Sequence, residues 1–117
     1  MLSLSLWVGT EQESMALIDE IRNKAGRGLF ELSKHAADQM IVRHIQIREV
    51  RQVFANSQII EDYPEDKYGP SCLLLGFTET RRPLHIQCSY PSRPVLKVVT
   101  LYEPDPSLWI DFRTRRN

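Results

Sequence analysis

The side chains in this 117-residue chain that could carry out chemistry are two histidines, a tyrosine and two arginines, spread over most of its length. They are His35, Arg43, His85, Tyr102 and Arg113. Together these residue types suit metal-independent cleavage of RNA, in which a ribose 2′-hydroxyl attacks the adjacent phosphate and the 5′-oxygen leaves. That reaction needs a general base, a proton donor and cations around the phosphorane-like charge. We therefore expect a catalytic site made from His35 or His85 as base or acid, Arg43 and Arg113 as charge stabilisers, and Tyr102 as positioner or proton donor.

His35 is expected in the first turn of a helix over residues 33–43, and Arg43 in its last turn. Ser33 is a good N-cap, because its hydroxyl can accept a hydrogen bond from an unpaired backbone N–H group. The positive end of the helix dipole should lower the pKa of His35 and favour the neutral imidazole, which can accept a proton. A structural histidine that caps the helix is the alternative, and the residues alone leave both open.

A second set of residues is expected to bind RNA: Lys97, Trp109, Arg115 and Arg116. The chain has no net charge, but residues 81–117 contain seven basic and three acidic residues. A local basic surface is compatible with a phosphate-bearing partner, although such runs are often only solvated faces. Each residue also has a structural interpretation: His85 as a half-exposed sheet residue, Lys97 as an edge residue that reaches solvent, and Tyr102 and Trp109 as core or rim aromatics.

Metal or cofactor chemistry is not expected. His85 and Cys88 have a spacing that suggests metal ligands, but residues three apart in a strand point to opposite faces of the sheet, so one ion could not bind both. The chain contains no phosphate-binding glycine loop, no Gly-x-Ser-x-Gly sequence and no Cys-x-x-Cys pair. The sequence therefore predicts no metal site and no cofactor.

Composition is typical of one globular domain, with 42% hydrophobic and 26% charged residues. The two cysteines, Cys72 and Cys88, cannot form a disulfide framework, which favours a reducing compartment and a cytoplasmic location. No apolar run is long enough to span a membrane, so no membrane association is expected. The apolar stretch 2–8 lacks preceding basic residues and a cleavage pattern, so it fits a signal peptide poorly.

The order of the expected elements predicts an α+β fold. Helices are expected over 12–25, 33–43 and 46–56, with a short strand over 28–32. Gln46 as N-cap and Glu49 as its capping-box partner define the third helix, and Ile45 and Val50 have the spacing of a hydrophobic staple. Strands are then expected from residue 59, over 72–78, over 84–90 and, as a central strand, over 95–102. The proline-rich breaks between them indicate an antiparallel meander.

Four short motifs follow one another along the chain: Ser-Lys-His-Ala at 33–36, Pro-Leu-His-Ile at 83–86, Val-Thr-Leu-Tyr at 99–102 and Pro-Asp-Pro at 104–106. Met40, Arg43, Ile45, Glu49, Val50, Trp109 and the 113–116 tail complete the pattern. In these residues the chain resembles, over about 15–116, a family of small bacterial domains of unknown function that is grouped with RelE, BrnT and MqsR toxins. Single motifs of this kind are weak, but their combination is fairly specific.

The resemblance implies a RelE-like fold, in which N-terminal helices pack on one face of a mostly antiparallel sheet. It implies the toxin of a type II toxin–antitoxin pair, with a cognate antitoxin that often carries an MqsA-like zinc finger. The suspected activity is that of an endoribonuclease acting on mRNA, including mRNA on the ribosome. A non-catalytic protein-binding module of the same fold, either a ParE-like inhibitor or an inactive remnant, is the alternative.

The chain departs from the family pattern in three ways. His44 and Gln46 stand where Gly and Ser usually open the following helix, so that turn should be shaped differently. The net charge is zero, whereas RelE-type ribonucleases tend to be basic. Residues 1–14 lie outside the pattern, and proteins of this kind commonly begin at the position of Met15. We therefore expect 1–14 to be a poorly ordered extension or a start-site artefact, and 15–117 to be a single RelE-like domain.

Overall fold

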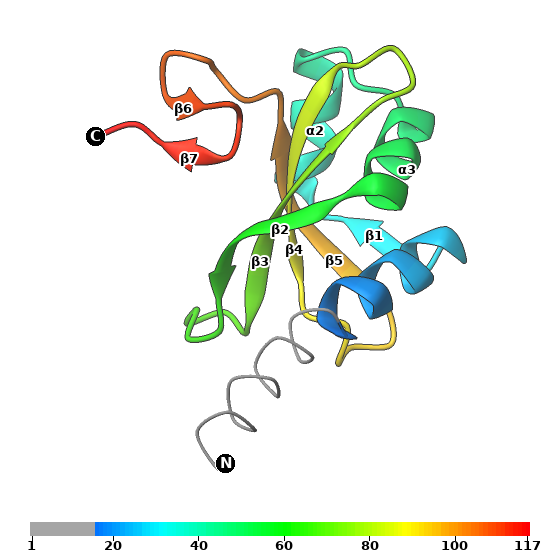
Figure 1. Ribbon diagram of the computed structural model, residues 1–117. Helices are drawn as coiled ribbons and strands as arrows, with labels where there is room; N and C mark the ends of the chain where they lie inside the picture. The colour runs from blue at the N-terminus through cyan, green and yellow to red at the C-terminus, as the bar shows by residue number, and fades with distance from the viewer. Residues whose placement is uncertain (1–15) are drawn as a thin grey trace.

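The computed structural model describes residues 16–117 and has the expected α+β order (Figure 1). The elements are a helix over residues 16–26, β1 (Phe30–Leu32), α2 (Lys34–Val42), α3 (Ile47–Asn56), β2 (Gln58–Tyr63), β3 (Ser71–Phe77), β4 (Pro83–Ser89), β5 (Leu96–Tyr102), β6 (Trp109–Ile110) and β7 (Thr114–Arg115). The predictions for residues 1–14, and for the start of the first helix, lie outside the described residues. No helix among residues 16–117 is long and apolar enough to cross a membrane.

Five strands form one sheet in the order β1-β5-β4-β3-β2. The strands β2 to β5 make the predicted antiparallel meander. β1 adds to the edge of β5 in parallel, and this pairing was not predicted. β5 is therefore an interior strand, as predicted, and Lys97 lies between two strands, not at an edge as its structural interpretation supposed.

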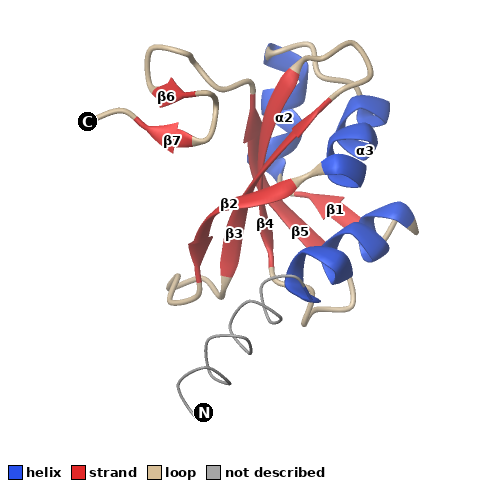
Figure 2. Ribbon diagram, in the orientation of Figure 1, coloured by secondary structure: helices blue, strands red, loops and turns tan. Residues whose placement is uncertain are grey.

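The helices and the strands pack as two layers. Figure 2 shows the helices gathered on one side of the sheet and the separate β6–β7 hairpin on the other. On the helix-covered face, Cys72, Leu74, Ile86 and Val98 contribute to the buried core, and Phe54 of α3 is among the largest side chains packed against them. The opposite face, called the helix-free face below, has its centre partly covered by the β6–β7 hairpin and carries most of the polar side chains of the sheet.

The helix ends follow the predicted capping. The Ser33 hydroxyl accepts a hydrogen bond from the Ala36 amide at 3.0 Å, and Glu49 Oε1 accepts one from the Gln46 amide at 2.9 Å. The turn after α2 places His44 at φ 54°, a left-handed conformation that glycine adopts without strain. The Ile45 amide reaches back to the Met40 carbonyl at 2.9 Å, as in a Schellman motif. His44 thus occupies a backbone position that suits the glycine it replaces.

Helix α3 lies close against the sheet at Gly76 of β3. A Cβ atom there would collide with the Val53 carbonyl oxygen and would lie 2.9 Å from the Asn56 amide oxygen. The Asn56 side chain binds the end of β3 like a neighbouring strand: its Nδ2 donates to the Phe77 carbonyl at 2.7 Å, and its Oδ1 accepts from the Phe77 amide at 2.8 Å. Glycine at position 76 therefore fixes how tightly α3 packs on the sheet.

Candidate functional site

A cluster of polar and aromatic side chains lies on the helix-free face, beneath and beside the β6–β7 hairpin. It is called the open-face cluster and consists of Glu61, Tyr63, His85, Tyr102, Trp109 and Arg115. These residues come from five strands, β2, β4, β5, β6 and β7. Four of them were predicted from the sequence, and the fold brings these four together.

Strand register sets the cluster. His85 of β4 is paired with Tyr102 of β5, and Glu61 and Tyr63 of β2 are paired with Leu73 and Ser71 of β3. A bulge in β2 at Ile60 places Glu61 on the helix-free face. The extra residue reverses the alternation of the side chains that follow it, so Glu61 and Tyr63 lie on the same face of the sheet as His85.

The β6–β7 hairpin closes over this row of residues. Its turn has two consecutive residues in the left-handed region, Asp111 at φ 52° and Phe112 at φ 63°, and the Arg113 amide donates to the Ile110 carbonyl at 2.9 Å. These φ values and this bond match a type I′ turn, which asparagine and glycine usually adopt, and Arg113 is a third loop residue because Ile110 pairs with Thr114. Phe112 is held there by an edge-on contact with Phe77, with ring centroids 6.5 Å apart, and by its carbonyl oxygen, which contacts His85.

The imidazole of His85 is fully buried, not half-exposed, because the hairpin covers it. Its Nε2 lies 2.6 Å from the Phe112 carbonyl oxygen, and its Nδ1 lies 3.1 Å from the Tyr102 hydroxyl. A carbonyl oxygen can only accept, so Nε2 carries the proton and Nδ1 accepts from Tyr102. The Trp109 ring packs edge-on with its centroid 4.5 Å from that of His85. Burial lowers the pKa of His85, and the Phe112 and Glu61 oxygens offset this only in part, so the ring is neutral.

The charged part of the cluster is an ion pair next to the imidazole. Arg115 Nε and Nη2 donate to the two oxygens of Glu61 at 2.8 and 3.1 Å, and the guanidinium stacks 4.6 Å from the centre of the Trp109 ring. The Tyr63 hydroxyl donates a short hydrogen bond to the same carboxylate. Burial and this bond raise the pKa of Tyr63 to about 12. Burial acts to raise the pKa of Glu61, but the bonds from Arg115 and Tyr63 outweigh it, so the carboxyl stays ionised.

The remaining residues predicted for the site lie around the cluster rather than in it. His35 is exposed at the start of α2, with Nε2 3.1 Å from the Thr100 hydroxyl. The guanidinium of Arg113 donates to the Gln58 side chain at 2.8 Å. Lys97 lies 3.6 Å from a carboxylate oxygen of Glu31, and Arg116 Nε donates to a backbone carbonyl at 3.0 Å. His35 and His85 both contact β5, but one is exposed and the other is buried.

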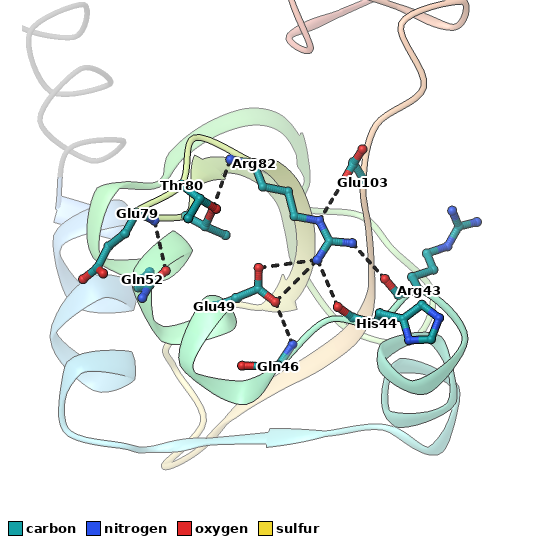
Figure 3. A network of polar contacts seen from close by, with 10 residues as sticks. Arg43, His44, Gln46, Glu49, Gln52, Glu79, Thr80, Arg82 and Glu103 are labelled. Carbon is teal, nitrogen blue, oxygen red and sulfur yellow. Dashed lines mark hydrogen bonds and ion pairs between the residues drawn. The ribbon is translucent and has the colours of Figure 1, made fainter.

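Arg43 belongs to a different polar network, which joins the α2–α3 turn to β5 (Figure 3). The Arg43 side chain donates to Gln39 at 2.9 Å within its own helix. Its carbonyl oxygen, like that of His44, accepts from the guanidinium of Arg82, which also binds Glu49 and Glu103. Arg82 thus connects the end of α2, the start of α3 and the end of β5, a structural arrangement in which the Arg43 side chain has no part.

Glu61 and Tyr63 were not predicted as site residues. In the sequence they border an acidic turn, where carboxylates are usually solvated. The sequence did contain one relevant signal, an acidic segment and a basic C-terminal segment of opposite charge. Glu61 and Arg115 form an ion pair between these two segments. The bulge that turns Glu61 toward His85 gave no sequence signal.

His85 and Cys88, whose spacing suggested metal ligands, lie on opposite faces of the sheet. His85 faces the cluster, whereas Cys88 lies in the core beside Cys72, so the two predicted opposite faces are confirmed. Within residues 16–117, no three His, Cys, Asp or Glu side chains are grouped to hold a metal ion. Among the groups of the cluster are an exposed guanidinium, a carboxylate and a tyrosine hydroxyl bonded to a neutral histidine.

Comparison with known families identifies one match. The family model described as "Domain of unknown function (DUF4258)" matches residues 32–103, from the end of β1 to just beyond β5. That range contains Glu61, Tyr63, His85 and Tyr102, and it excludes the β6–β7 hairpin with Trp109 and Arg115. No curated protein and no solved structure matches the chain significantly.

Proposed function

The chain belongs to the DUF4258 family of domains of unknown function, and we propose that it is a metal-independent endoribonuclease with the open-face cluster as its active site. In this proposal the fold is RelE-like, and the protein is the toxin of a type II pair whose cognate antitoxin restrains it. Mixed-sequence single-stranded RNA, including mRNA on the ribosome, is the substrate.

Arg115 supplies the phosphate contact. Its side chain is 63% exposed, and the pair with Glu61 occupies only Nε and Nη2. The N–H groups of Nη1 are left to donate to phosphate oxygens. Because Glu61 and the Trp109 ring hold the guanidinium on one side, little reorganisation is needed when charge develops on the phosphorane.

The Tyr102–His85 pair supplies proton transfer. The 2′-oxygen bonds to phosphorus while its proton passes to the Tyr102 oxygen, and the Tyr102 proton passes to Nδ1 of His85. The phosphorus–O5′ bond breaks, the leaving oxygen takes a proton from water, and the hydroxide formed takes the added proton back from His85 through Tyr102, which restores the neutral pair. The imidazolium formed is stabilised by the Phe112 carbonyl and the nearby Glu61 carboxylate. The products are a 2′,3′-cyclic phosphate and a 5′-hydroxyl.

One observation carries this proposal: an exposed guanidinium stacks on the Trp109 ring, which packs against a neutral histidine bonded to the hydroxyl of a half-buried tyrosine. Burial raises the pKa of Tyr102, and the positive charge of Arg115 acts in the opposite direction. In many active sites a base activates the nucleophile, and a third group orients that base.

The test is cleavage of a mixed-sequence single-stranded RNA in EDTA. Arg115→Gln should slow cleavage about 10²-fold or more, since it removes a charge stabiliser. Tyr102→Phe should slow it about 10²–10⁴-fold, the range of general acid–base catalysis. Arg51→Gln, which removes an exposed arginine from α3 on the other face, is the matched control and should cleave like the wild type. Equal rates for Arg115→Gln and Arg51→Gln, or an inactive wild type, would contradict the proposal.

A non-catalytic protein-binding module is the second candidate, and one observation favours it. Ile41 and Val42 at the end of α2 are 75% and 71% exposed, and Ile47 at the start of α3 is also exposed. Neighbouring exposed apolar side chains of this size often mark protein contacts. If expression arrests bacterial growth, if Arg115→Gln leaves that arrest intact and if a double Ile41→Ser, Val42→Ser variant abolishes it, the protein acts by docking rather than by cleavage.

A further inference from the structure

A groove opens on the helix-free face next to the open-face cluster. It has a volume of about 270 Å³ and lies between the β2–β3 loop and the start of β5. Its lining includes Asp66, Tyr68, Ser71, Ser89, Arg93 and Lys97, and it is called the Tyr68 groove. Small-ligand sites commonly have volumes of about 300–1,000 Å³, so this groove has room for about one ring system.

The register of the sheet connects this groove to the cluster. Tyr63 pairs with Ser71, Ser71 pairs with Ser89, and the Lys97 amide donates to the Ser89 hydroxyl at 2.9 Å. One row further along the same face come Glu61, Leu73 and Gln87, and the next row contains His85 and Tyr102. At the usual rise of a strand, Ser89 and His85 are about 13 Å apart along β4. The groove and the proposed cleavage site therefore lie on the same face of the sheet.

The groove combines an aromatic platform with cations. Tyr68 is 80% exposed as a residue, and the Lys67 ammonium lies 5.0 Å from the centre of its ring. The Arg93 guanidinium is next to Gly69, where a Cβ atom would lie 3.6 Å from Nη2, and Lys97, whose ammonium lies 3.6 Å from a Glu31 carboxylate oxygen, also lines the groove. Aromatic rings that stack bases, combined with a positively charged track for phosphates, are the usual means of binding single-stranded nucleic acid.

The polar atoms of the floor have partners within the protein. The Ser89 hydroxyl accepts from the Lys97 amide, and the Ser71 hydroxyl accepts from the Gln87 amide group and donates to Asp66. Because these groups are already bonded, the floor offers few contacts to the edge of a base. A base in this groove would be held by its flat face, which all four bases share.

We propose that the Tyr68 groove binds a nucleotide of the RNA that flanks the cleaved bond, with its base stacked on Tyr68 and its phosphate between Arg93 and Lys97. This inference rests on the proposed function for its substrate class. The inference adds that RNA binding extends beyond the open-face cluster. The groove is expected to show little preference for one base over another.

The test is the affinity for a fluorescein-labelled 2′-O-methyl hexanucleotide, which lacks the attacking hydroxyl and is not cleaved. Stacking of a base on an aromatic ring is worth about 1–3 kcal/mol, so Tyr68→Ala should weaken binding about 5- to 150-fold. Tyr68→Phe keeps the ring and should bind within about two-fold of the wild type. Arg93→Gln and Lys97→Gln should each lower the slope of log affinity against log salt by about 0.7, whereas Arg51→Gln should not.

The possible outcomes separate this inference from the proposed function. Ring-dependent binding by a protein that cleaves no RNA supports the groove and contradicts the ribonuclease. Cleavage by the wild type, together with wild-type affinity in Tyr68→Ala and Arg93→Gln, overturns the groove and leaves the ribonuclease standing. The groove is also overturned if the wild type does not bind the oligonucleotide or if polyglutamate competes as well as unlabelled RNA. Unchanged thermal unfolding of each variant confirms that it is folded.

Discussion

The buried imidazole of His85 should make the protein less stable in mild acid. In the folded state both ring nitrogens are occupied, Nε2 as donor to Phe112 and Nδ1 as acceptor from Tyr102, so an added proton displaces the Tyr102 bond and charges a buried group. Burial lowers the pKa of His85 below its usual value of about 6.5, although Glu61 acts against this and Arg115 with it.

The sign and the size of the effect follow from proton linkage. Above pH 6.5 the imidazole is neutral in both the folded and the unfolded chain, and its full contribution to stability is present. As the pH falls below 6.5, the unfolded chain binds a proton that the folded chain does not, so the free energy of unfolding decreases. The decrease approaches about 1.4 kcal/mol per pH unit and stops once the pH passes the folded-state pKa.

The assay is urea denaturation of the wild type and His85→Gln at pH 7.5, 6.5 and 5.5. Glutamine keeps a neutral amide donor near the Phe112 carbonyl but does not titrate. Between pH 6.5 and 5.5 the wild type should lose up to about 1.0 kcal/mol more than His85→Gln, because the unfolded histidine is already half protonated at pH 6.5 and all other titrating groups are shared. Identical pH dependence in the two proteins would refute the assignment of a buried, neutral His85.

Three further substitutions test the packing around the site, each by its shift in urea midpoint. Gly76→Ala should cost about 3 kcal/mol, because its methyl group collides with the Val53 carbonyl and forces α3 off the sheet; a loss below about 1 kcal/mol would contradict that close approach. Ser33→Ala should cost about 1 kcal/mol through the lost N-cap, and no measurable loss would argue against the cap. Arg82→Met should cost about 2 kcal/mol, because Glu49 and two carbonyls lose their donor; a neutral result would show that water replaces it.

Local chemistry was the most predictable part of the fold. Ser33 and Gln46 begin their helices as expected, Asn56 ends α3, and the alternating and β-branched segments form the meander. These features depend on capping residues and on the periodicity of hydrophobic residues, both of which can be recognised from residues close together in the sequence. The parallel pairing of β1 with β5 depends on contacts between distant segments, and nothing in either segment indicates it.

The site was less predictable than the fold, for reasons that can be named. The β6–β7 hairpin turns at Asp111 and Phe112, which lack the usual Asn-Gly signal, so a hairpin that covers His85 was not expected. Because this hairpin was not predicted, His85 was interpreted as a half-exposed residue of the sheet. Residue types did identify His85, Tyr102, Trp109 and Arg115 as candidates. Glu61 joined them only through a bulge and an ion pair that the fold creates.

The central claim, that the open-face cluster cleaves RNA through the 2′-hydroxyl without a metal, is tested most directly by the ends of the products. A 5′-labelled RNA incubated with the wild type in EDTA should give fragments ending in 2′,3′-cyclic phosphate, and the same RNA with one 2′-deoxy residue should resist cleavage at that position. Arg115→Gln should yield few or none of these fragments. Fragments ending in a 3′-hydroxyl, cleavage at the deoxy position, or intact RNA with the wild type would contradict the claim.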